Sequence, residues 1–199
     1  MLIDFKPLET RALTMLEFAA QFSQDDLHAA TSTSIETLLN LVHDLNDAAV
    51  IFDPLDPNAH DPYAAPDEEK IGWNIAHLVA HVTASSEEWA AYSSILARGI
   101  AYPAEPRLRY ETPWRSMLTK TQCVQRLEES RRIRLAYLDT WPDEPHLYVY
   151  RGLSDRFIER FGPINAPAAF LYGLWHEVGH HEQFRKVARQ AKAAVTTTA

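Results

Sequence analysis

The amino-acid sequence predicts an all-α protein built as a four-helix bundle. Apolar residues recur at three- and four-residue intervals in several stretches, typical helix-capping residues precede those stretches, and no strand-like alternation persists in the chain. Proline-rich stretches separate the predicted helices, which indicates a bundle with long connections. The 199 residues, 46% of them hydrophobic, are enough for one domain with a substantial core. We therefore expect a single helical domain over residues 1–199.

The first 30 residues are expected to form a helical extension that precedes the bundle. Residues 7–22 are weakly amphipathic, which predicts one helix. Ser23 is followed by Asp25 and Asp26, an N-cap with acidic residues in the first turn, and predicts a short helix that ends near residue 30. The bundle itself is then expected to occupy residues 31–194.

The first two bundle helices are predicted over residues 33–50 and 74–97. Thr33 and Glu36 have the spacing of a capping box, and a clear apolar stripe follows them. Asn74 is the expected N-cap of the second helix. His43 lies beside the apolar stripe of the first helix, and we interpret it as a helix-surface histidine rather than a ligand.

The other two bundle helices are predicted over residues 119–140 and from Asn165 to about residue 194, with a frayed tail at 195–199. Arg131 and Arg134 belong to a basic run that is typical of a solvated face, with anion binding as the alternative. Two glycines, Gly173 and Gly179, interrupt the last helix, which favours close packing against a neighbour or room for a ligand.

The connections are predicted over residues 51–70, 98–117 and 142–167, where prolines and glycines are frequent. Residues 154–161 could form a short helix within the last of them. The first connection contains His60, which we interpret as an exposed loop residue, although a long loop can deliver a side chain to a site.

The composition excludes several classes of function. The formal net charge is −8 and no block of lysine and arginine occurs, so nucleic-acid binding is not expected. No run of about 18 apolar residues predicts a membrane span, and the N-terminus lacks the pattern of a signal peptide, so the cytoplasm is the default location. Cys123 is the single cysteine, so no intrachain disulfide can form. We interpret it as a half-buried helix residue rather than a catalytic thiol.

Histidines at helical spacing are the strongest functional signal. His176 and His180 are four residues apart in the last predicted helix, so both rings lie on one helix face and can bind one metal ion. A third ligand must come from another helix. His81 in the second bundle helix is the best candidate, and His77, one turn earlier, is its rival.

Residues 176–180 also match the H-E-x-x-H pattern of zinc metallopeptidases, in which Glu177 would be the general base. The pattern needs a third ligand further along the chain, and residues 181–199 contain no suitably spaced histidine. No β-sheet is predicted to hold a peptide substrate. A metallopeptidase is therefore a less favoured alternative.

The two histidine-bearing helices together resemble the DinB/YfiT-like superfamily over roughly residues 33–190. The resemblance is carried, in chain order, by Trp73, Asn74, His81-Val82, His176, His180, His181 and Gln183. Members of that superfamily are four-helix bundles that hold a metal with three histidines. The resemblance implies that His81, His176 and His180 are the ligands, and that His77, Glu177 and His181 line the pocket or support the ligands.

The resemblance also implies a divalent transition metal, namely zinc, nickel, iron or manganese, and three neutral imidazoles suit zinc, nickel, iron or copper. Relatives include metal-dependent hydrolases and thiol-dependent transferases, so we expect a small-molecule substrate and, in the second case, a low-molecular-weight thiol. Glu88, or Glu87 beside it, is the candidate general base. Relatives often form homodimers. The alternatives are a bundle that binds a metal or small ligand without catalysis, and a structural dimer with a vestigial site.

Overall fold

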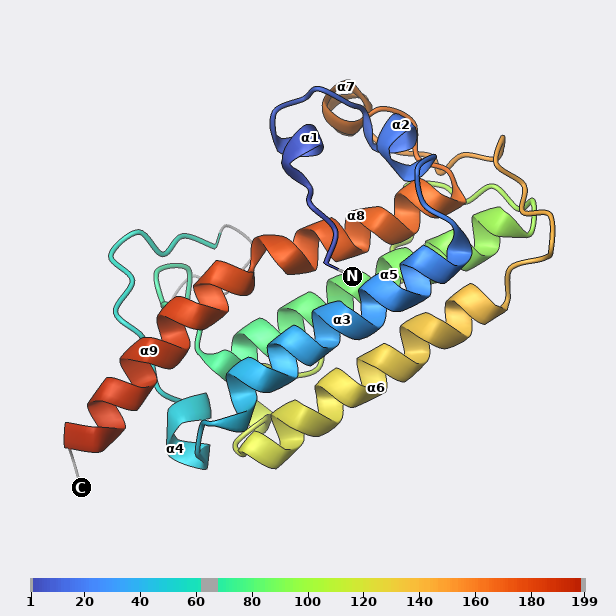
Figure 1. Cartoon of the computed structure of the whole chain (residues 1–199). Coiled ribbons are helices and arrows are strands. Elements are labelled where there is room, and N and C mark those ends of the chain that lie inside the picture. Colours follow the sequence, from blue (N-terminus) through green and yellow to red (C-terminus); the bar gives the residue numbers. More distant parts are fainter. Residues whose placement is uncertain (1, 62–67, 198–199) are drawn as a thin grey trace.

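The computed structural model describes residues 2–61 and 68–197, and every regular element in that part of the chain is a helix (Figure 1). The all-α prediction is therefore confirmed. Among the described residues, no helix combines the length and the apolar character that crossing a bilayer requires.

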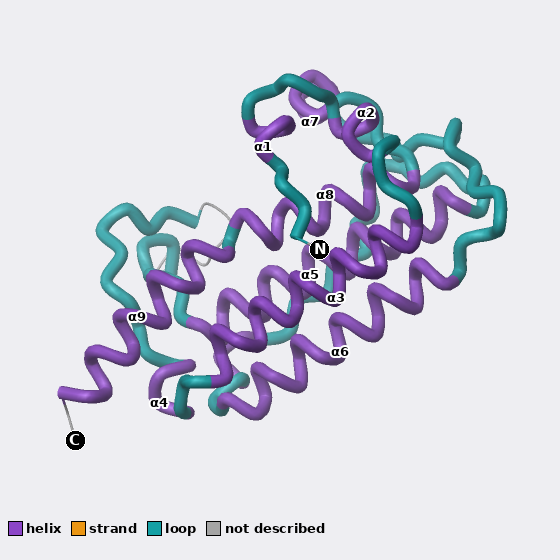
Figure 2. The backbone as a smooth tube through the Cα atoms, in the orientation of Figure 1, coloured by secondary structure: helices purple, strands orange, loops and turns teal. Residues whose placement is uncertain are grey.

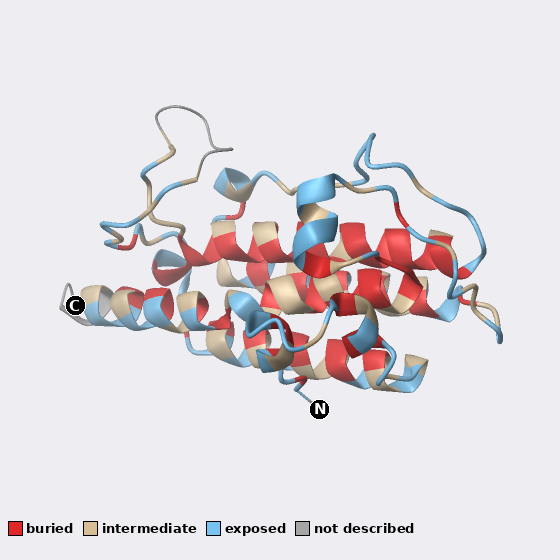
Figure 3. Cartoon of the chain, turned by 90° about the horizontal axis from the view of Figure 1, so that it is seen from above, coloured by how far each residue is buried: buried red, intermediate tan, exposed pale blue. Residues whose placement is uncertain are grey.

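Four long helices pack side by side and form the body of the molecule (Figure 1). They are α3 (Gln24–His43), α5 (Ile75–Ala97), α6 (Lys120–Asp139) and α8 (Ala166–Gly179). Helix α5 is the central element, because it contacts both α6 and α8, while α3 contacts the same two helices. Most residues of α5 are buried (Figure 3), which explains why its sequence shows no clean polar face.

Shorter helices lie against this body. Helices α1 (Lys6–Glu9), α2 (Met15–Ala19) and α7 (Asp155–Phe161) lie together above α8 in Figure 1. Helix α4 (Asp47–Val50) lies at the lower left of that view, beside the longer helix α9 (His181–Thr197), which follows α8. Long loops join the elements (Figure 2), and one of them contains a single turn of 3-10 helix, η1 (Trp114–Ser116).

Most of the predicted helix starts are confirmed. The side chains of Asn74, Thr119, Ser154 and Asn165 each accept a hydrogen bond from a backbone N–H in the first turn of α5, α6, α7 and α8 respectively. The short helix expected near residues 154–161 is present as α7. Helices α5 and α6 match their predicted ranges closely.

The expected start of a bundle helix at residue 33 is wrong, because α3 begins at Gln24. Ser23 and Asp26 form a reciprocal capping box at that point. The hydroxyl of Thr33, expected to cap a new helix, instead donates to the carbonyl oxygen of Ala29 within α3. The predicted division between extension and bundle therefore falls inside one helix. That helix ends at His43, short of the predicted residue 50, and the separate α4 follows.

The single helix predicted over residues 7–22 is also wrong, since two short helices form there. Arg11 between them has φ of 58°, a left-handed conformation that interrupts a helix. Thr14 and Glu17 then form a capping box that begins α2.

The last predicted helix divides into α8 and α9 at His180. The N–H of His180 bonds the carbonyl oxygen of Glu177, three residues back, so the turn tightens at the end of α8. Gly179 precedes this junction and lowers the local helix propensity. Helix α9 continues to Thr197, so the tail expected to fray from residue 195 is helical to that point, and residues 198–199 lie outside the described part.

Candidate metal centre

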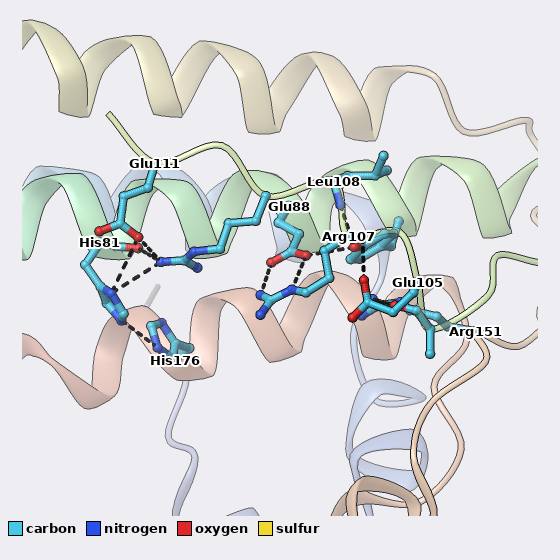
Figure 4. Close-up of polar contacts among 11 residues, drawn as sticks. His81, Glu88, Glu105, Arg107, Leu108, Glu111, Arg151 and His176 are labelled. Atoms are coloured by element: carbon cyan, nitrogen blue, oxygen red, sulfur yellow. Dashed lines mark hydrogen bonds and ion pairs between the residues drawn. The ribbon is translucent and has the colours of Figure 1, made fainter. Parts of the chain in front are cut away.

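An imidazole of α5, that of His81, meets two from the C-terminal part of the chain, those of His176 and His180. One ring nitrogen from each of His81, His176 and His180 lies within 4.8 Å of those of the other two. The Nε2 atoms of His81 and His176 are 3.2 Å apart, and Figure 4 shows these two rings turned toward each other from α5 and α8. His180 completes the group from the junction of α8 and α9. We refer to these three residues as the histidine trio.

Helix packing explains why the rings meet. Helix α8 approaches α5 closely at Gly173, where an added Cβ would lie 3.1 Å from the Cβ of Trp89 and 3.2 Å from the Cα of Ser86. A larger side chain would hold the two helices apart. The expectation of close packing is thus met at Gly173. A Cβ at Gly179 would meet nothing within 4 Å, so no packing requirement explains that glycine.

The environment keeps the trio uncharged at neutral pH. Burial, and then the neighbouring imidazoles, lower the pKa of His81 to about 2. Burial, and then the neighbouring His180 and the cavity arginines, lower the pKa of His176 to about 3. Burial also lowers the pKa of His180. Neutral imidazoles keep the lone pair that a metal ion requires.

Contacts on the outer ring nitrogens differ among the three. The Nδ1 atom of His180 is 2.8 Å from Oε1 of Gln183, so an N–H there donates to the amide and leaves Nε2 with its lone pair. The Nδ1 atom of His81 is 3.8 Å from a carboxylate oxygen of Glu111 and 3.3 Å from a guanidinium nitrogen of Arg109. The Nδ1 atom of His176 is buried and has no hydrogen-bond partner within the described chain.

The geometry and chemistry of the trio fit a transition metal. Two nitrogens bound to one tetrahedral zinc at about 2.05 Å would be about 3.3 Å apart, close to the separation of the His81 and His176 nitrogens. The third ring, within 4.8 Å, would need a shift on the order of 1 Å to reach the same ion. Three imidazoles without a thiolate suit zinc, nickel, iron or copper rather than magnesium or calcium.

His77, the rival for the first position, has a different environment. Its ring stacks between Trp73 and Trp114, at centroid distances of 4.5 Å and 4.6 Å. Burial lowers its pKa to about 4. Trp73 also contacts the ring of His81, at 4.5 Å. His77 therefore lines the approach to the trio, and the geometry brings His81 rather than His77 into it.

Glu177 faces the bundle interior and is fully buried. It accepts hydrogen bonds from Ser34 at 2.5 Å and from Ser86 at 3.3 Å, and Nη1 of Arg134 lies 3.1 Å from its Oε2 atom. His181 is buried in the same region, 3.4 Å from the hydroxyl of Ser34. A carboxylate held in this way is not placed as the general base of an H-E-x-x-H site.

The prediction of a solvated basic face on α6 is wrong for Arg134, whose side chain is only 1% exposed and lies between the bundle helices. Its guanidinium contacts Glu177 as an ion pair, but the angles do not satisfy a hydrogen bond. Arg131 agrees better with the prediction, since it forms ion pairs with Glu128 and Glu36 near the surface.

Glu88 and Glu87, the candidate general bases, have other partners. Glu88 is buried and accepts hydrogen bonds from Arg107, at 2.9 Å from Nε, and from the hydroxyl of Tyr92 (Figure 4). Glu87 pairs with Arg126. Within the described chain, no hydrogen bond or ion pair joins either carboxylate to the trio.

A cavity of about 940 Å³ opens beside His81 and His176 and extends along α5 and α8. His77, His81, Ser85 and Trp89 follow one another at four-residue spacing along α5, and all line it. The loop after α5 adds charged residues that the sequence reasoning missed, namely Arg107, Arg109 and Glu111. Charged residues alternate with apolar or aromatic ones in Arg107-Leu108-Arg109-Tyr110-Glu111, and this alternation was the one sequence feature that could have indicated them. A loop has no regular repeat, however, so the alternation does not predict which helix these side chains face.

The remaining candidates lie outside the centre. Cys123 is fully buried rather than half-buried, and burial raises its pKa to about 12, which agrees with a structural role. His43 is exposed beside Asp44, as predicted. His60 pairs with Glu69 in the loop, with 63% of its side chain exposed.

The family model described as DinB superfamily matches residues 14–184. Neither the curated proteins nor the solved structures contain a match to the chain.

Proposed function

The chain belongs to the DinB superfamily, and on that premise we propose that it is a metal-dependent enzyme acting on a small molecule, by hydrolysis or by transfer of a low-molecular-weight thiol. The observation that supports this most is the position of the histidine trio. Two of its three residues, His81 and His176, line a cavity large enough for a small-molecule substrate, so the trio does not lie in a closed core. A structural metal site would be surrounded by protein on all sides.

In this proposal His81, His176 and His180 hold a divalent transition metal. The chemistry that such an ion would supply is activation of a water or thiol by lowering its pKa, together with polarisation of the substrate. Gln183 fixes the ring of His180 through its hydrogen bond to Nδ1. The side chains of Ser85, Arg109 and Glu111, which line the cavity, would position the substrate beside the trio.

Glu111 is better placed than Glu88 to exchange protons near the metal. Its carboxylate is 3.8 Å from Nδ1 of His81 and lines the cavity, while Glu88 is held by Arg107 and Tyr92. Arg109, which pairs with Glu111, would orient that carboxylate. We therefore assign the role of general base, or of ring-orienting acceptor, to Glu111.

Metal analysis of the purified protein tests the first half of the proposal. The wild type should retain close to one equivalent of a transition metal, and a His176→Ala, His180→Ala double variant should retain none. His77→Phe, which keeps a ring between Trp73 and Trp114, is the matched control and should retain the metal. A double variant that binds as much metal as the wild type would refute the assignment.

Tryptophan fluorescence gives an independent readout of the same binding. The ring of Trp73 is 4.5 Å from that of His81 and 5.8 Å from that of His180. A paramagnetic ion such as Ni²⁺ or Cu²⁺ bound by the trio should quench Trp73. Quenching that is unchanged in the His176→Ala, His180→Ala double variant would show that the ion binds elsewhere.

Turnover tests the second half. The metal-loaded protein would be assayed on ester and amide substrates, and on electrophiles with different thiols, with the metal-free protein as the blank. Activity lost in the double variant supports the enzyme. Tight retention of a ligand without turnover with any metal would favour the non-catalytic binding bundle. Light scattering on the same samples tests the homodimer that relatives suggest.

A further inference from the structure

The cavity has a second end, away from the trio, that is walled by aromatic rings and an arginine. Trp89 of α5, Phe157 of α7, Tyr172 of α8 and Arg151 of the preceding loop line it. Trp89 follows His81 by eight residues on the same face of α5, so the two ends are roughly 12 Å apart at 1.5 Å per residue. One molecule of modest length could therefore occupy both ends.

The aromatic wall is a continuous packed cluster. The ring centroids of Trp89 and Tyr172 are 4.3 Å apart, those of Phe157 and Tyr172 are 5.1 Å apart, and Trp89 stacks on Phe157 at 5.8 Å. Rings that pack against one another lose little further freedom when a ligand arrives. This wall suits a planar apolar group.

Arg151 is almost entirely buried beside these rings, with 7% of its surface exposed. Its guanidinium lies over the ring of Tyr92 at 3.5 Å and over that of Trp89 at 4.7 Å. Its only side-chain hydrogen bond within the described residues is a long one, 3.4 Å, to the carbonyl oxygen of Ala104, and its Nε atom has no partner there. Its backbone N–H donates to the carbonyl oxygen of Ile164, and the contacts with the two rings position the guanidinium.

The other two arginines of the cavity are already neutralised. Arg107 pairs with Glu88, and Arg109 pairs with Glu111 (Figure 4). Among the described residues, no carboxylate forms an ion pair with Arg151. A buried cation without a counter-ion is costly, and natural proteins rarely keep one without a use.

We propose that Arg151 and the rings of Trp89, Phe157 and Tyr172 form a carboxylate subsite, so that the substrate is a carboxylic acid with a planar apolar group. This rests on the proposed function, because the reacting end of that substrate would then lie at the trio. An arginine fork matches a carboxylate in two parallel hydrogen bonds. A dianionic phosphate is disfavoured, because one arginine cannot balance two negative charges in a buried site.

The test compares 4-phenylbutanoate with its uncharged amide, 4-phenylbutanamide, by calorimetry on chelator-treated full-length protein. The two probes share their apolar part, so the comparison isolates the carboxylate. The acid should bind at least 10-fold more tightly than the amide. Arg151→Met should weaken the affinity for the acid at least 10-fold and change the affinity for the amide less than twofold.

Arg160→Met is the matched control. Arg160 also lies over aromatic rings, 4.8 Å from Phe161 and 5.9 Å from Trp175, but it does not line the cavity. The Arg160→Met variant should leave the affinities for the acid and for the amide unchanged. If Arg151→Met does not fold, as judged by circular dichroism, Arg151→Lys replaces it. Lysine keeps the positive charge but lacks the two parallel N–H donors of the guanidinium, so this variant should weaken the affinity for the acid at least threefold.

The outcomes separate this inference from the metal proposal. Equal binding of acid and amide, binding of neither, or acid binding unaffected by the Arg151 variants would overturn the subsite. Acid binding that appears only in metal-loaded protein and vanishes in His176→Ala would place the carboxylate at the trio and also overturn it. Acid binding by metal-free protein that depends on Arg151 supports the subsite, whatever metal analysis shows for the trio.

Discussion

Replacing Glu177 with glutamine should strongly destabilise the fold, because it removes the negative partner of a buried cation. Arg134 is 1% exposed and Glu177 is not exposed at all, with 3.1 Å between the charged atoms. The amide keeps the size of the side chain and its acceptor oxygen for Ser34, so the change is mainly one of charge. Removing one partner of a buried ion pair costs about 3–5 kcal/mol of unfolding free energy.

For a chain of this length, about 1 kcal/mol corresponds to roughly 2–4 °C in Tm, so Glu177→Gln should lower Tm by roughly 6–20 °C. Urea unfolding followed by circular dichroism, with the same m-value assumed for both proteins, measures the free energy directly. Glu182→Gln is the control. Glu182 is an exposed carboxylate that also binds arginines, and its loss should leave the free energy of unfolding nearly unchanged.

A double variant, Arg134→Met with Glu177→Leu, completes the test. It removes both charges together, so it should recover at least half of the stability that Glu177→Gln loses. If Glu177→Gln is as stable as the wild type but inactive, Glu177 acts in catalysis and the structural interpretation is refuted.

Three further predictions concern packing, pH and reactivity. Gly173→Ala should lower the free energy of unfolding by about 1–3 kcal/mol, because the added methyl group overpacks against Trp89. Gly179→Ala, whose added Cβ would meet nothing within 4 Å, should be neutral or stabilising by up to about 1 kcal/mol. Chemical unfolding of both variants compares them directly. His77 has a pKa of about 4 in the folded protein, against 6.5 for the free side chain, so its contribution to stability is complete above pH 6.5 and is lost as the pH falls toward 4. In the metal-free His77→Phe variant, the free energy of unfolding should therefore fall less steeply over this range, by up to about 1.4 kcal/mol per pH unit. An unchanged slope would contradict the burial of that ring. Native Cys123 should resist a thiol reagent until the protein unfolds, and rapid labelling in buffer would show that the core opens there.

Local sequence signals were sufficient where one strong cap or one period decided the structure. Asn74 and Asn165 cap the helices predicted from them, because the side-chain oxygen and the first-turn N–H are close in sequence. Local reasoning failed where two caps competed. Ser23 began α3, and Thr33 was incorporated into it, since continuing a helix is cheaper than starting a new one.

The sequence by itself determined the all-α class and the placing of His176 and His180 on one helix face, because helical spacing is a local property of the chain, and the family resemblance favoured His81 over His77 as the third residue. Only the tertiary structure decided which side chains these residues contact. It turned His81 rather than His77 to His176, buried Glu177 against Arg134, and brought Arg107, Arg109, Glu111 and Arg151 from loops to one cavity. Loop residues have no periodicity that fixes their direction, and ion pairs between distant segments depend on how the helices pack.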